Sequence, residues 1–163
     1  YWEASSIGQV CALLGIEPDH HLRLVAAADH CLGAAYRGQC PGVDPDDLME
    51  WRTASRAAFQ KRSVDAVLAD VAAAREILKS HQIGGLADLT EHDHIPELPE
   101  AAVREGICFI SKIKDRDGRS KIVCQVGSPD QIQYFLEHYA PESGLIDTYG
   151  DPARGFAGGY LKD

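Results

Sequence analysis

Apolar residues recur at helical spacing through the first 85 residues of the chain, and this pattern limits the fold more than any other feature. Four such runs follow residues that favour the start of a helix, and they cover 7–14, 22–35, 48–59 and 64–78. The clearest start is Asp44-Pro45-Asp46-Asp47, which combines an N-cap carboxylate, proline at the first helical position and negative charge in the first turn. The sequence therefore predicts an N-terminal bundle of four or five helices over residues 1–85.

A β-hairpin is predicted in the second half of the chain. Two β-rich runs, 107–113 and 121–126, flank Asp117-Gly118, which is a strong signal for a hairpin turn. A two-residue turn there pairs Ser111 with Cys124, Phe109 with Val126 and Ile113 with Ile122. Because side chains alternate along a strand, Cys108 is then expected on the opposite face of the hairpin from Cys124.

One more helix and a further strand are expected after the hairpin. Ser128-Pro129-Asp130-Gln131 has the residues of a capping box, with proline at the first helical position. Ile132 and Phe135 continue it as the apolar stripe of a helix. Residues 145–149 are predicted as a third strand and 150–159 as an irregular tail.

Two prolines, Pro96 and Pro99, divide the chain into two domains. We expect a helical domain at 1–85, a proline-containing linker at 86–100 and a small mixed part at 101–163. The predicted fold class is α+β, with a helix-turn-helix-like start to the bundle and a ββα or ββαβ arrangement in the mixed part.

The start of the chain carries the most specific motif. Its sequence is Ile7-Gly8-Gln9-Val10-Cys11-Ala12-Leu13-Leu14-Gly15-Ile16-Glu17-Pro18, followed by Leu22-Arg23. This run resembles the helix-turn-helix of MerR-type transcription regulators, and the pattern of residues 48–71 is similar to the two helices that follow the wing in that family. The rest of the chain carries no resemblance. The resemblance implies contact with DNA or a protein partner through His20, His21, Arg23 and Arg37, and a homodimer.

Net charge limits the partners of the chain. Its first hundred residues hold 8 basic and 16 acidic side chains, which argues against nonspecific binding of nucleic acid or of an anionic membrane by the whole surface. One local exception lies on the predicted hairpin, which has five basic side chains and only two acidic ones. These residues, expected to contact an anion, are Lys112, Lys114, Arg116, Arg119 and Lys121.

The cysteines indicate a reducing compartment. The chain has five, with no CxxC pair and no short regular spacing, so we expect free thiols and a cytoplasmic protein. No run of apolar residues approaches the roughly 20 that a membrane-spanning helix needs.

A candidate metal-binding motif lies in the predicted linker. His92-Asp93-His94 places two imidazoles on the same side of an extended segment, which suits a transition metal if Asp88, His81 or a cysteine supplies a third ligand.

Our principal hypothesis is a bacterial-type, non-enzymatic regulatory or interaction protein that needs no cofactor. Its helix-turn-helix-like front contacts DNA or a protein, and its mixed rear part binds a ligand or dimerises. One alternative is a small metal- or thiol-dependent enzyme that uses His92, His94 and a cysteine. Another is an acidic inhibitor or immunity-type protein that uses the carboxylates of Asp44, Asp46, Asp47 and Glu50.

Overall fold

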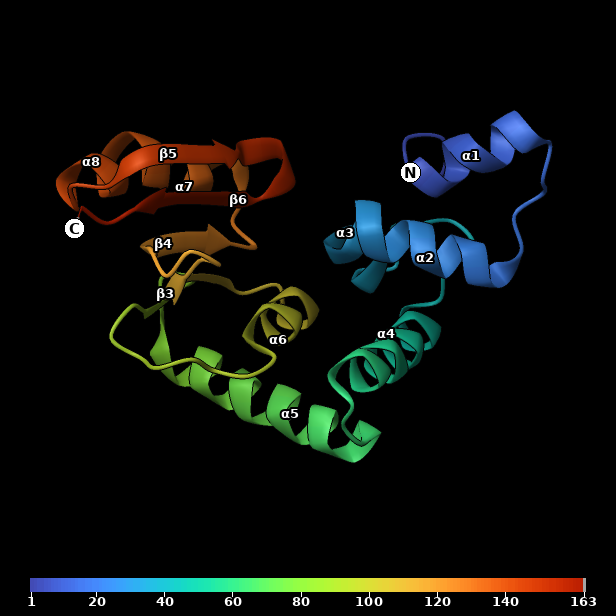
Figure 1. Cartoon of the computed structure of the whole chain (residues 1–163), viewed down its shortest axis with the longest axis horizontal. Helices are drawn as coiled ribbons and strands as arrows, with labels where there is room; N and C mark the ends of the chain where they lie inside the picture. Colours follow the sequence, from blue (N-terminus) through green and yellow to red (C-terminus); the bar gives the residue numbers. More distant parts are fainter. Residues whose placement is uncertain (163) are drawn as a thin grey trace. The chain divides into compact units, whose positions relative to one another are not determined.

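The computed structural model describes residues 1–162, and the chain forms two compact units, Tyr1–Ala69 and Asp70–Asp163 (Figure 1). We call these the N-terminal and the C-terminal unit. The fold class is α+β with a helical N-terminal part, as the sequence predicts. The helix α5 (Val64–His81) runs across the division between the units. Among the described residues, no helix is long and apolar enough to cross a lipid bilayer.

The N-terminal unit is helical, and side chains cap the starts of most of its helices. These helices are α1 (Ser6–Leu14), α2 (His20–His30), α3 (Leu32–Tyr36) and α4 (Pro45–Gln60), followed by the start of α5. The Asp44 carboxylate accepts hydrogen bonds from the amides of Asp46 and Asp47, as its N-cap position predicts. The single helix expected over 22–35 is broken at Cys31, which leaves the helical conformation with φ −145°. The apolar core of the unit consists of Leu24, Ala27, Ala35, Cys40, Val43 and Leu48.

The first residues of the chain fold back against α1. The Ser5 hydroxyl donates to the Trp2 carbonyl oxygen at 2.7 Å and accepts from the Gly8 amide at 3.1 Å. A Cβ atom added at Gly8 would overlap the same Trp2 carbonyl oxygen. Glycine at this position therefore permits the close approach of residues 1–5 to the helix.

We expect Gly8→Ala to destabilise the N-terminal unit by about 1–3 kcal/mol, because the added methyl group forces the Trp2 carbonyl away. Gly33→Ala is the matched control: its Cβ would meet only the Arg37 Nη1 atom at 3.4 Å, so the change should cost nothing or stabilise slightly. Urea unfolding followed by tryptophan fluorescence measures this unit alone, since Trp2 and Trp51 are the only tryptophans. Equal stabilities of the two variants would contradict the close contact between Gly8 and the Trp2 carbonyl oxygen.

The C-terminal unit is built on a six-stranded sheet in the order β1-β2-β3-β4-β6-β5. Its strands are β1 (Gln82–Ile83), β2 (Leu86–Leu89), β3 (Cys108–Lys114), β4 (Ser120–Gln125), β5 (Ile146–Asp151) and β6 (Phe156–Tyr160). Only β2 and β3 pair in parallel, and α6 (Leu98–Glu105) connects them. The other neighbours are antiparallel.

Helices cover both faces of this sheet (Figure 1). The C-terminal half of α5 and the helix α6 pack on one face, around Val71, Leu78 and the fully buried Phe109. The opposite face is covered by a continuous helical segment that consists of α7 (Pro129–Tyr134), a π-helical turn η1 (Phe135–Tyr139) and α8 (Ala140–Glu142). The capping box predicted at Ser128 and Gln131 is confirmed at the start of α7.

The predicted hairpin register is wrong by one residue. Ile110, not Ser111, pairs with Cys124, so Cys108 and Cys124 lie on the same face of the sheet. The loop has three residues rather than two, because the Asp115 carboxylate accepts hydrogen bonds from the amides of Asp117 and Arg119. These bonds stabilise a turn whose pairing register is one residue earlier than that of a two-residue turn at Asp117-Gly118. Gly118 supplies the left-handed residue that such a loop needs.

Two segments predicted to be irregular are strands. Residues 86–100, expected as a linker, contain β2 and the first turn of α6. The expected tail at 150–159 contains the end of β5 and most of β6, an interior strand despite its glycines. A Cβ at Gly158 would lie 2.7 Å from the Tyr149 hydroxyl, so glycine there makes room for a side chain of the neighbouring strand.

Candidate functional site

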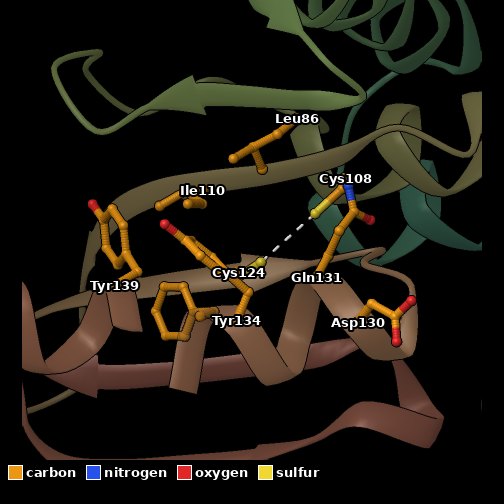
Figure 2. Close-up of a pocket in the computed structure, with 9 residues that line it drawn as sticks. Leu86, Cys108, Ile110, Cys124, Asp130, Gln131, Tyr134 and Tyr139 are labelled. Atoms are coloured by element: carbon orange, nitrogen blue, oxygen red, sulfur yellow. Dashed lines mark hydrogen bonds between the residues drawn. The ribbon is translucent and has the colours of Figure 1, made fainter. Parts of the chain in front are cut away.

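A cavity of about 230 Å³ lies between the sheet and the helical segment α7–η1 (Figure 2). The strands β2, β3 and β4 form one wall and the helical segment forms the other. Most of the lining side chains are apolar or aromatic, and the lining residues are Leu86, Cys108, Ile110, Cys124, Asp130, Gln131, Tyr134, Phe135 and Tyr139. A concave apolar site with few polar groups is typical of the binding of small molecules.

A polar bridge closes one end of the cavity. The Gln131 Nε2 atom donates to the Gly85 carbonyl oxygen at 3.3 Å, which ties the start of α7 to the turn before β2. The Oε1 atom of the same side chain accepts from the Ser128 amide at 2.9 Å as part of the capping box. One glutamine therefore fixes both the helix start and the edge of the cavity.

The helical wall contains the π-helical turn. Phe135 and Tyr139 are its first and last residues, both line the cavity, and their rings stack with centroids 5.1 Å apart. Burial raises the pKa of the Tyr139 hydroxyl. A π-helical turn is rare and occurs frequently at functional sites. Here it brings two aromatic residues onto one wall.

Two thiols lie side by side on the strand wall (Figure 2). The Sγ atoms of Cys108 and Cys124 are 3.6 Å apart, and both residues are buried. A hydrogen bond from the Cys124 thiol lowers the pKa of Cys108, against the opposing effect of burial. The pKa of Cys124 is raised, because its proton is held in that bond and because burial disfavours the thiolate. Of the two thiols, Cys108 is therefore the one that loses its proton more readily.

We expect iodoacetamide at pH 8 to modify Cys108 before Cys124, since the thiolate is the reacting species. Peptide mass spectrometry after short exposure of the folded protein measures the order. In Cys124→Ser a hydroxyl replaces the thiol donor, and Cys108 should remain reactive. Faster modification of Cys124 in the wild-type protein would contradict the assigned direction of the hydrogen bond.

The residues predicted to contact DNA or a partner make contacts within the N-terminal unit. The His20 Nε2 atom lies 3.2 Å from the Asp47 Oδ2 atom, and the His21 ring packs edge-on against Trp51. The Arg23 guanidinium lies over the Trp2 ring at 5.8 Å.

Arg37 is exposed, and its Nε atom donates to Gln39 Oε1 at 3.3 Å. Three carboxylates of the acidic set, Asp44, Asp46 and Asp47, lie at the N-terminus of α4, where the helix dipole favours negative charge.

The basic side chains of the hairpin divide into two groups. Lys112, Lys114 and Arg116 are exposed. Arg119 pairs with Asp147 at 3.2 Å and lies over the Tyr160 ring at 3.9 Å. Lys121 is half-buried, 6.0 Å from the same ring. Four of the five are therefore exposed, and one of these four, Arg119, is held by Asp147 and the Tyr160 ring.

The structure does not bring His92 and His94 together with a cysteine. Both histidines line a second cavity of about 320 Å³, on the face of the sheet that carries Phe109 and Ser111. The cysteine pair lies on the opposite face, so the sheet separates the two sets. His92 instead contacts His81, with 3.0 Å between the Nε2 atoms. Within residues 1–162, no three side chains of histidine, cysteine, aspartate or glutamate form a metal-binding group.

Sequence reasoning missed the first cavity. The sequence places Leu86 in the linker, and the predicted register puts Cys108 on the opposite face of the hairpin from Cys124, whereas the structure has both on one face. The signal that could have found the cavity is the side chain of Asp115, because an Asx turn there shifts the register by one residue.

No family model, no curated protein and no solved structure matches this chain.

Proposed function

We propose that this is a non-enzymatic regulatory protein whose C-terminal unit binds a small, mainly apolar molecule in the cavity lined by Leu86, Cys108 and Tyr139. The observation that supports the proposal is the character of that cavity: apolar strand side chains on one wall and three aromatic rings on the other. Burial of apolar ligand surface contributes roughly 25 cal/mol per Å² and requires no charged partner.

The size of the cavity selects the ligand class. Apolar protein cavities of about 150 Å³ hold benzene, so 230 Å³ suits a molecule of one or two fused rings. Four of the lining residues have polar side-chain groups that can form hydrogen bonds, and these residues are Asp130, Gln131, Tyr134 and Tyr139. We therefore propose an aromatic or heteroaromatic ligand of about the size of indole or naphthalene.

The test is thermal unfolding of the whole chain with saturating indole or naphthalene, followed by far-UV circular dichroism. A ligand that binds only the folded state stabilises it by RT ln(1 + [L]/Kd), so the melting temperature should rise with concentration. An unchanged melting temperature with both compounds would contradict the proposal.

For the N-terminal unit we propose a protein partner rather than DNA. The helix α1 contains no charged residue and exposes apolar side chains, with Leu13 86% and Leu14 66% exposed. Affinity for DNA comes largely from lysine and arginine contacts to phosphate, whereas exposed apolar clusters are typical of protein interfaces.

We expect no retardation of random-sequence duplex DNA by the protein, at low or at physiological salt, because the first hundred residues carry twice as many acidic as basic side chains. A gel retardation assay measures this directly. Selective retention of a dyad-symmetric sequence would instead assign the helix-turn-helix-like pair to DNA.

A further inference from the structure

Two histidines of the C-terminal unit direct ring nitrogens at each other. His81 is the last residue of α5, and His92 lies in the loop after β2. Their Nε2 atoms are 3.0 Å apart, and the rings meet edge to face with centroids 4.5 Å apart. Both residues are half-buried, whereas His94 is exposed.

The protonation pattern of His81 follows from its other nitrogen. The Nδ1 atom lies 2.9 Å from the Ile77 carbonyl oxygen, and a carbonyl oxygen only accepts hydrogen bonds. The Ser80 hydroxyl, 3.0 Å from the same Nδ1 atom, itself donates to the Ile77 carbonyl oxygen, so Nδ1 carries the proton and the Nε2 atom presents a lone pair to His92. Histidines that bind metals are held in the same way, with the second nitrogen donating to a backbone carbonyl.

The loop that carries His92 is also held by hydrogen bonds. The His92 amide donates to the Leu89 carbonyl oxygen at 3.1 Å. The Thr90 amide and hydroxyl donate to the Asp88 carboxylate at 3.0 and 2.7 Å. The two imidazoles are thus fixed from a helix end and from an ordered turn.

From this geometry we infer that His81 and His92 together bind a divalent transition-metal ion. Two nitrogens at about 2.0–2.1 Å from one tetrahedral metal are about 3.3 Å apart. The Nε2 atoms of His81 and His92 are 3.0 Å apart, so they must separate by only about 0.3 Å to bind the same ion. Imidazole ligands suit Zn²⁺, Ni²⁺ and Cu²⁺. Water completes the coordination, since no third such side chain joins the pair within residues 1–162.

Metal binding requires one proton to move. In the metal-free pair the His92 Nε2–H donates to the His81 Nε2 lone pair, so His92 must shift its proton to Nδ1 before both lone pairs face the ion. Neither ring changes its charge in this step, because each stays neutral.

The test is titration of the whole chain with Co²⁺ and with Ni²⁺, monitored by calorimetry and by the visible spectrum of Co²⁺. We expect one equivalent to bind. His92→Ala should weaken binding at least about tenfold, since it removes a ligand. His94→Ala is the matched control and should leave the affinity unchanged.

The spectrum distinguishes the histidine pair from the thiols, because thiolate ligands give intense charge-transfer absorption that imidazole does not. Should His92→Ala fail to fold, the broadening of wild-type amide signals by Cu²⁺ locates the ion instead, with the strongest effect at His81 and His92. Equal weakening by His92→Ala and His94→Ala, a thiolate spectrum, broadening elsewhere in the chain, or no binding would each overturn the inference.

Discussion

Leu86→Trp is expected to weaken the binding of indole or naphthalene by about tenfold or more, which is about 1.4 kcal/mol or more in binding free energy. Leu86 is half-buried on β2 and lines the cavity. A tryptophan side chain at this position can occupy the space that the ligand would take. Because it fills a cavity rather than a packed core, the variant should unfold at no lower temperature than the wild-type protein.

Leu136→Trp is the matched control for this experiment. Leu136 is also half-buried and packs against the same apolar core, but it does not line the cavity. Fluorescence or calorimetric titration of both variants gives the affinities. If Leu86→Trp binds the probes as tightly as the wild-type protein, the ligand does not occupy this cavity.

Phe109→Ala is expected to lower the free energy of unfolding of the C-terminal unit by about 3–5 kcal/mol. Phe109 is 1% exposed at the centre of the core between the sheet and the helices α5 and α6. Removing its ring forfeits apolar burial and leaves a cavity that closely packed neighbours fill only in part.

Phe59→Ala is the same substitution at a side chain that is 90% exposed, and it should change the stability by less than about 0.5 kcal/mol. Urea unfolding followed by far-UV circular dichroism compares the two variants. A loss of less than about 1 kcal/mol in Phe109→Ala would show that the α5–α6 face of the sheet is not a packed core.

The helices were predictable because their signals are local. The side chains of Asp44, Ser128 and Gln131 accept hydrogen bonds from amides two or three residues away. A capping pattern in the sequence therefore predicts where a helix begins without knowledge of the rest of the fold. The exception is Cys31, where the apolar pattern continues but the backbone breaks between α2 and α3.

The strands that were missed depend on contacts between distant residues. Gly158 weakens a strand considered alone, yet it suits β6 because Tyr149 of the neighbouring strand crosses it. Leu86 pairs in parallel with Cys108 across the α6 crossover, and no local pattern marks such a partner. The strand propensity of a segment depends on its own residues, whereas the pairing of strands depends on the whole sheet.

The candidate site was missed for a related reason. A slip of one residue moves every side chain of a strand to the other face, so the register decides whether Cys108 and Cys124 meet. The π-helical turn that presents Phe135 and Tyr139 has no sequence signature.

The most direct test of the central claim is a titration of the isotopically labelled protein with naphthalene, monitored by amide chemical shifts. Ligand in the cavity should shift the amides of Leu86, Cys108, Cys124, Gln131 and Tyr139, and leave those of α1 unchanged. Shifts confined to the exposed apolar residues Leu13 and Leu14, or no shifts at saturation, would contradict the claim that this cavity is a binding site.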